Sequence, residues 1–284
     1  MSRRTDNRHR AATLCREATG LPHHVCLRWA AEGLISRGQP VPDAESPAQR
    51  AFEARVALVL VYAMRAGARL GITAVRPTPS GLGIELHPDL SPGVFAALMP
   101  RVDPGSGDLE GVPGLRLEHR RDGLHLCCVA SGGAIRILQS VPAWRQPLPR
   151  GRMVYVGRRV DIPLHSAERA RLDDWADGPA ARDWLLSRLL RRPLLVNAAD
   201  VVLGWAHGRG YGHSDGQPYG YGDLVIEWCC DRGVAELEGR LRRSGLATAP
   251  PGIGPGDPPV PGVIALENAR VVLRRIIRHE CAAC

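Results

Sequence analysis

The sequence predicts an α+β protein with an N-terminal helical hairpin, a long central helix packed on a mainly antiparallel sheet, and a helical C-terminal half. Three observations support this fold class. Helix signals fill residues 8–70, short strand-like runs broken by Pro and Gly follow, and helical patterns return after residue 161. The domains expected from these changes are residues 1–42, 43–160 and 161–284.

The N-terminal hairpin is expected to comprise helices at residues 8–18 and 22–35, joined by a turn at Gly20. Glycine suits this turn because it adopts a left-handed conformation without steric cost. Pro22 suits the start of the second helix, because the N–H that it lacks would have no helical partner there.

The long central helix begins at a clear signal. Ser46 is the expected N-cap, and the side chain of Gln49 is expected to reach back to it. The helix is expected to run to Leu70 and to end at Gly71. Its centre, residues 56–64, is apolar on every side, which predicts the hub against which the sheet packs.

The region after this helix is expected to form the sheet. Asp122-Gly123 separates two of its strand-like runs and predicts a hairpin turn, which favours antiparallel pairing. The expected strands are residues 72–76, 83–87, 115–120, 124–130, 134–139 and 153–156, with a short helix at residues 92–98.

The C-terminal half is expected to be mainly helical, with Asn197 as one helix cap. It contains a glycine-rich loop, residues 204–222, and a Pro/Gly linker, residues 247–262. In the closing helix a basic stripe is expected beside an apolar one. The expected helices are residues 167–176, 179–192, 198–207, 224–243 and 263–281, and the basic stripe is Arg270, Arg274 and Arg278.

Composition excludes several classes of protein. All 37 basic residues among the 284 are Arg, so lysine-dependent P-loop and Schiff-base chemistry is excluded. The longest apolar run, residues 56–64, is far shorter than the roughly 20 residues that span a bilayer. No apolar stretch near the N-terminus could serve as a secretory signal. We therefore expect a cytoplasmic protein with no membrane partner.

The net charge of +8 is unevenly distributed along the chain. Residues 1–42 carry seven Arg against three acidic residues, and residues 123–160 carry six Arg and no acidic residue. Such segments favour an anionic partner, with nucleic acid first.

Residues 14–29 resemble the helix-turn-helix segment of bacterial transcription regulators. The positions at which that family keeps glycine or apolar residues are matched by Gly20, Leu21, Cys26 and Trp29. Arg16 departs from the pattern, because it stands where a small residue normally lets the two helices meet. The resemblance implies that the second helix lies in the major groove of DNA. The exposed groups that it implies are Arg3, Arg4, Arg8, Arg10, His23, His24 and Arg28.

The leading functional hypothesis is a non-enzymatic nucleic-acid-associated protein that contacts phosphates through Arg-rich surfaces, with DNA favoured over RNA. Another hypothesis is a scaffold or assembly subunit that binds a protein partner or a second copy of itself. In the acid-free segment the expected phosphate contacts are Arg145, Arg150, Arg152, Arg158 and Arg159, with Trp144 and Tyr155 as stacking groups.

The glycine-rich loop supports a different hypothesis, an enzyme. Residues 212–216 read G-x-S-x-G and resemble the nucleophile elbow of the α/β-hydrolases, although the helix that follows the elbow in that family has no counterpart in the sequence. In this hypothesis Ser214 is the nucleophile, or His207 or His213 is a general base or metal ligand with Asp215 as its partner.

The C-terminal residues offer a zinc hypothesis, and no other cofactor is expected. His279, Cys281 and Cys284 have zinc-like spacing, and Cys229 or Cys230 would supply a fourth ligand if the fold brought them together. Most of the eight cysteines are expected to be reduced and to pack as small apolar residues in the core.

Overall fold

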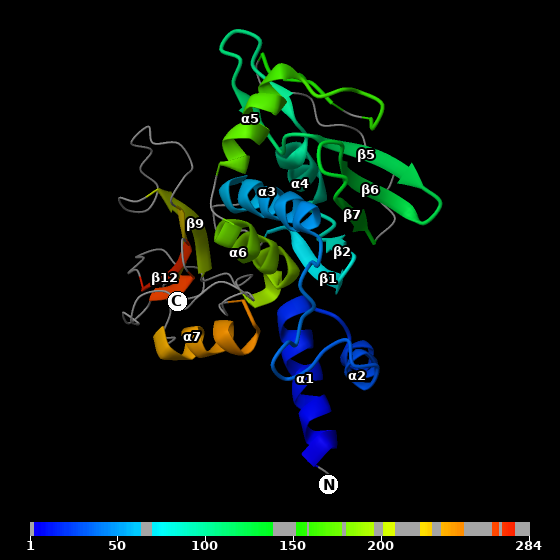
Figure 1. The fold of residues 1–284 in the computed structure, drawn as a ribbon, viewed down its shortest axis with the longest axis vertical. Helices are drawn as coiled ribbons and strands as arrows, with labels where there is room; N and C mark the ends of the chain where they lie inside the picture. The colour runs from blue at the N-terminus through cyan, green and yellow to red at the C-terminus, as the bar shows by residue number, and fades with distance from the viewer. Residues whose placement is uncertain are drawn as a thin grey trace.

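The computed structural model confirms the α+β class (Figure 1). It describes residues 3–63, 70–138, 152–157, 159–177, 180–195, 201–207, 222–228, 234–246, 263–266 and 269–275.

The N-terminal hairpin consists of α1 (Arg3–Thr19) and α2 (His23–Ala31), and it extends from one end of the molecule in Figure 1. Gly20 forms the predicted turn with a φ of 77°, and its N–H donates to the carbonyl of Arg16 at 2.9 Å. The expected continuation of the second helix to residue 35 is wrong. Gly33 has a φ of 79°, and this left-handed conformation ends the helix.

The central helix, α3 (Pro47–Ala63), begins where predicted, since the Ser46 hydroxyl accepts from the N–H of Gln49 at 3.4 Å. The expected return bond from the Gln49 side chain to Ser46 is wrong. Instead, Gln49 Oε1 accepts from the N–H of Ala134 at 2.9 Å, and Nε2 donates to the Ala134 carbonyl at 2.8 Å. The buried side-chain amide of Gln49 thus bonds the backbone N–H and carbonyl at the start of strand β7 (Ala134–Ile137), as a neighbouring strand would. These two bonds attach α3 to the sheet.

The main sheet has five strands in the order β1-β2-β7-β6-β5. All pairs are antiparallel except β2 with β7, so the prediction of a mainly antiparallel sheet is confirmed. The hairpin expected at Asp122-Gly123 joins β5 to β6, with Arg120 opposite Gly123. The strands are β1 (Ile72–Thr78), β2 (Gly81–Leu86), β5 (Leu115–Arg120), β6 (Gly123–Cys128) and β7 (Ala134–Ile137).

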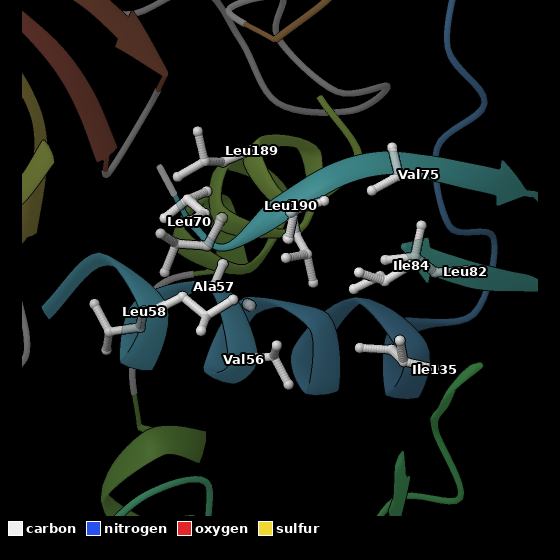
Figure 2. Packing of buried hydrophobic residues seen from close by; sticks show 14 of the residues in the cluster. Val56, Ala57, Leu58, Leu70, Val75, Leu82, Ile84, Ile135, Leu189 and Leu190 are labelled. Carbon is white, nitrogen blue, oxygen red and sulfur yellow. The ribbon is translucent and has the colours of Figure 1, made fainter. Parts of the chain in front are cut away.

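The core lies between this sheet and the helices that cover one of its faces. Val56 and Ala57 of α3 pack into the same buried cluster as Ile84 of the sheet and Leu190 of α6 (Figure 2). The apolar centre of α3 is therefore the predicted hub. The remaining elements around this core are α4 (Ser91–Leu98), α5 (Ser166–Ala176), α6 (Ala180–Arg191), the 3-10 turn η1 (Pro193–Leu195), and a small sheet of β3 (Arg101–Val102), β4 (Leu109–Glu110) and β8 (Val154–Tyr155).

The prediction of a helical C-terminal half is wrong in part. The segments expected as helices at 198–207 and 263–281 contain strands, and the one at 224–243 is a strand followed by a helix. Their short apolar runs are compatible with the hydrophobic period of a helix and with that of a strand. Pairing between segments that are distant in the sequence favours the strand. These elements are β9 (Val201–His207), β10 (Gly222–Trp228), α7 (Val234–Arg243), β11 (Val263–Leu266) and β12 (Ala269–Arg275), in a sheet of order β11-β12-β10-β9.

Residues 269–275 form a strand, so the expected basic stripe along a closing helix is wrong for Arg270 and Arg274. Arg270 and Arg274 lie on β12, which pairs in parallel with β10, and Arg278 lies outside the described residues. The Pro/Gly linker at 247–262 also lies outside them.

Buried ion pairs join α6 to the elements that precede the sheet. Both carboxylate oxygens of Glu53 accept from Arg191, each at 2.8 Å, and both side chains are fully buried. Asp43 accepts from Arg188 at 2.7 Å and from Arg192 at 3.0 Å. These contacts connect residues on the two sides of the boundary expected at residue 160, while the domain limits themselves stay predictions.

Replacing Arg191 by Met is expected to lower the free energy of unfolding by about 3–5 kcal/mol, because it leaves the buried Glu53 carboxylate without its cation. Urea denaturation of the purified chain measures the loss. Arg159→Met removes an exposed arginine whose bond to Asp161 spans 3.1 Å, and its cost should stay within about 0.5 kcal/mol. Equal losses in the two variants would contradict a special role for the buried pair.

Stability is expected to fall in acid through two carboxylates. Burial alone would raise the pKa of Asp43 and of Glu168. The arginines that donate to them, and for Glu168 also the N–H groups of His165 and Gly114, outweigh burial, and both pKa values lie below their ordinary range. Glu168 accepts from Arg116 at 2.8 and 3.0 Å. As the pH falls, these carboxylates therefore bind protons at a higher pH in the unfolded chain than in the folded one. The stabilisation that they provide is complete above about pH 5 and is lost as the pH falls below about 4.

Urea unfolding between pH 7 and pH 3 tests this acid dependence. Asp43→Asn should lower stability at pH 7 and flatten the decline toward pH 3, whereas the exposed Asp161→Asn should leave the profile in place. An unchanged profile in Asp43→Asn would show that other groups control the acid limb.

Candidate nucleic-acid interface

The hairpin α1–α2 has a hydrophobic cluster separate from the main core. On the α1 side the contact is made by small side chains: Ala12 and Cys15 are fully buried, in one cluster with Cys26 and Trp29 of α2. Small residues allow two helices to approach closely at a turn of this kind. The cluster comprises Ala11, Ala12, Cys15, Leu21, Cys26, Trp29, Ala30 and Ile35.

The departure of Arg16 from the helix-turn-helix pattern does not disturb this contact. Arg16 is exposed in the structure, whereas its neighbour Cys15 is fully buried. The close approach is made at Ala12 and Cys15, so the guanidinium of Arg16 does not separate the helices.

The outward face of α2 is basic and lacks acidic side chains. His24, Arg28 and Ala31 are exposed, at spacings of four and three residues that place them on one side of the helix. The first acidic group is Glu32 at the C-cap, whose carboxylate lies 4.0 Å from Arg28 Nε. This pair is largely exposed and weak, so Arg28 is available to a ligand.

The first helix carries further exposed arginines on the same hairpin. Arg8 is exposed, and Arg10 is exposed and paired with Asp6 at 2.9 Å. Arg3 and Arg4 lie in the first turn of α1, and their side chains are outside the described part. The rings of His9 and His23 lie 6.0 Å apart, which brings α1 and the start of α2 to one surface.

All three arginines on α6 are buried, in contrast to Arg8, Arg10, Arg16 and Arg28 of the hairpin. They lie on carboxylates or carbonyl groups in the core, so they add nothing to the surface charge. Sequence reasoning missed this use of arginine, although Arg188, Arg191 and Arg192 recur at helical spacing among leucines. The buried arginines of the described residues are Arg55, Arg116, Arg182, Arg188, Arg191 and Arg192.

The second surface proposed from the sequence is only partly described. Arg152 and Arg159 are exposed, and Arg159 is paired with Asp161. Tyr155, expected as a stacking group, packs on the main core instead. The structure does not describe Trp144, Arg145, Arg150 or Arg158, and predictions for them stay predictions.

The start of the glycine-rich loop expected at residues 204–222 is wrong, because residues 204–207 lie in strand β9. His207 ends β9 and pairs with Gly222, the first residue of β10, so the loop joins two antiparallel strands. A nucleophile elbow leads from a strand into a helix, and the next described element here is the antiparallel β10. His213, Ser214 and Asp215 lie outside the described residues, so their expected roles stay predictions.

The described residues were compared with the predictions for a metal site, a membrane span and the cysteines. No group of three His, Cys, Asp or Glu side chains within the described ranges is arranged to hold a metal, and His279, Cys281 and Cys284 lie beyond those ranges. No described helix is long and apolar enough to cross a membrane. The prediction that cysteines occupy the core is confirmed for four of them, which are buried and free: Cys15, Cys26, Cys127 and Cys128.

Comparisons of the chain with protein-family models, with curated proteins and with solved structures gave no match. The function must therefore be inferred from the geometry of the chain itself.

Gly20 fixes how the hairpin meets the rest of the protein. A Cβ on Gly20 would lie 2.6 Å from the backbone oxygen of Thr73 and 2.9 Å from a methyl carbon of Leu194, and the φ of 77° disfavours any side chain. Gly20→Ala is therefore expected to lower the free energy of unfolding by more than about 1 kcal/mol. It should also speed hydrogen exchange in α2.

Gly33→Ala is a matched control, because Gly33 has a φ of 79° and a Cβ added there would meet no described atom within 4 Å. The Gly33→Ala variant has the same unfavourable φ as Gly20→Ala, but its Cβ does not clash with a described neighbour. Exchange in α2 that rises equally in both variants would show that the close approach at Thr73 does not hold the hairpin.

Proposed function

We propose that this chain is a non-enzymatic DNA-binding protein that contacts the duplex through the hairpin α1–α2. The observation that carries the proposal is the outward face of α2. It presents His24 and Arg28 without an acidic neighbour before Glu32, on a helix held by a glycine turn and a close-packed small-residue contact. This combination is typical of helices that read DNA.

The dimensions of α2 suit the major groove. Its nine residues give a length of about 13 Å, and the groove of B-DNA admits one helix. An exposed arginine there can donate two bonds to guanine, and the exposed His24 offers a further donor or acceptor. Arg28 is therefore the proposed base contact, with His24 one turn before it. His23, expected to be exposed, is half-buried and its Nδ1 is buried.

The arginines of α1 would serve as phosphate contacts. Arg8 and Arg10 are exposed, and Arg3 and Arg4 precede them on the same helix, in the part of the hairpin farthest from the sheet (Figure 1). Phosphate contacts of this kind position a protein on DNA and account for much of its affinity.

DNA is favoured over RNA because the proposed contact is a helix in a major groove. The major groove of A-form RNA is too deep and narrow for side chains to read. A cytoplasmic location, which the sequence predicts, would give a bacterial protein access to its chromosome.

Fluorescence anisotropy with labelled duplex DNA, single-stranded DNA and duplex RNA across a salt series tests the proposal. We expect duplex DNA to bind most tightly, with log affinity falling linearly with log salt. Each phosphate contact adds about 0.9 to the slope. Changing Arg8, Arg10 and Arg28 to Gln together should weaken binding at least about tenfold and reduce the slope by about 2.

A matched control removes the same charge from the body of the protein. Arg76, Arg121 and Arg169 are exposed and lie outside the hairpin, so their triple change to Gln should keep affinity within about twofold. A separate Arg152→Gln, Arg159→Gln variant tests the surface next to β8. Absence of salt-dependent binding, or equal loss in the hairpin and body variants, would overturn the proposal.

A further inference from the structure

Two buried arginines in the body of the protein have incomplete hydrogen bonding. Arg55 in α3 is 5% exposed, and Arg182 in the first turn of α6 is 2% exposed. Nε of Arg55 and Nη1 of Arg182 are buried and have no acceptor among the described residues. A buried cationic donor without an acceptor is unfavourable, so both nitrogens favour a partner.

Other buried arginines show that this chain normally satisfies such groups. Arg116, Arg191 and Arg192 each place all three guanidinium nitrogens on an acceptor. Within the described part of the chain, Arg55 has one hydrogen bond, from Nη2 to the sulfur of Cys128 at 3.3 Å. Its environment therefore differs from that of the fully bonded arginines.

Both guanidinium groups lie against the same aromatic ring. The Cζ atom of Arg182 is 3.7 Å from the ring centroid of Trp175, and that of Arg55 is 6.0 Å from it. Arg182 also donates from Nη2 to the Trp175 carbonyl at 2.7 Å. Elements α3, α5 and α6 thus bring two buried cations around one indole.

The local charge is not balanced by the described residues. Asp183 is the carboxylate that contacts this group, with Oδ1 accepting from Arg182 Nε at 3.3 Å and from the Trp175 indole at 3.0 Å. Burial raises the pKa of Asp183. Burial also lowers the pKa of Arg182, and the nearby positive charge of Arg55 lowers it further. Asp183 thus faces Arg55 and Arg182, and the positive charge of Arg50 also lies near it.

Two segments that adjoin these elements in the sequence, residues 64–69 after α3 and residues 178–179 before α6, contain no Asp or Glu. An anion from outside the chain would balance the charge among the described residues.

We propose that Arg55 and Arg182 form a binding site for a small oxoanion beside Trp175. Guanidinium N–H groups match the oxygen pairs of carboxylates and phosphates. The site lies in the body of the protein, so it is independent of the proposed DNA contact by the hairpin.

Thermal unfolding of the full chain at constant ionic strength tests the site, with chloride replaced stepwise by acetate or by inorganic phosphate. We expect a saturable rise in Tm, about 5 °C at an anion concentration 100 times the dissociation constant. Arg55→Met and Arg182→Met should each abolish the saturable rise. Arg76→Met removes an exposed arginine and should retain it.

Asp183→Asn provides a second variant if the arginine variants do not fold. Removing this carboxylate increases the excess positive charge, so the midpoint of the acetate titration should shift to lower concentration. A rise with either anion supports the oxoanion site, and the anion with the lower midpoint identifies its class. No saturable rise with either anion, a rise that survives in Arg55→Met, or an unchanged midpoint in Asp183→Asn would overturn the proposal.

Discussion

Burial of arginine is the constraint on which the rest of the fold depends. A guanidinium can leave water only where carboxylates and carbonyl groups replace its lost hydrogen bonds. Arg191 meets this requirement with both oxygens of Glu53, and Arg192 with Asp43 and three backbone carbonyls. Burial lowers the pKa of Arg192 to about 10, so it remains a cation at neutral pH.

These ion pairs determine how the apolar parts of the core fit together. Hydrophobic contact between α3 and α6 is non-directional and would allow several registers. The paired hydrogen bonds from Arg191 to Glu53 allow only one register between α3 and α6. The same side chain also donates to the carbonyls of Pro42 and Thr78, which fixes α6 relative to β1. The position of α6 on the sheet is thus set by polar groups inside an apolar cluster.

The same constraint changes how the net charge of +8 is interpreted. Charge counted along the sequence treats every arginine as a surface group. Once Arg116, Arg188, Arg191 and Arg192 are paired internally, they no longer contribute to the field that a ligand meets. Arg8, Arg10, Arg16 and Arg28 of the hairpin are exposed, so they do contribute to that field.

The elements predictable from sequence are those with strong local signals. The Ser46 cap and apolar centre of α3 located the hub, and Asp122-Gly123 located a hairpin of the main sheet. The C-terminal strands were mistaken for helices, because the apolar runs of β9, β10 and β12 are short and their pairing joins distant segments. The exposed groups of the candidate interface, His24 and Arg28, could be predicted from their place in a helix-turn-helix pattern.

The buried groups could not be predicted in the same way. Nothing local distinguishes Arg55, whose cation lacks a full set of acceptors, from Arg191, which is completely bonded. That difference arises from partners more than 70 positions away in the chain, Cys128 in one case and Glu53 in the other. Burial by itself therefore does not distinguish an arginine that holds the fold together from one that is suited to bind a ligand. The two kinds of arginine are distinguished by how many of their guanidinium nitrogens have a hydrogen-bond acceptor.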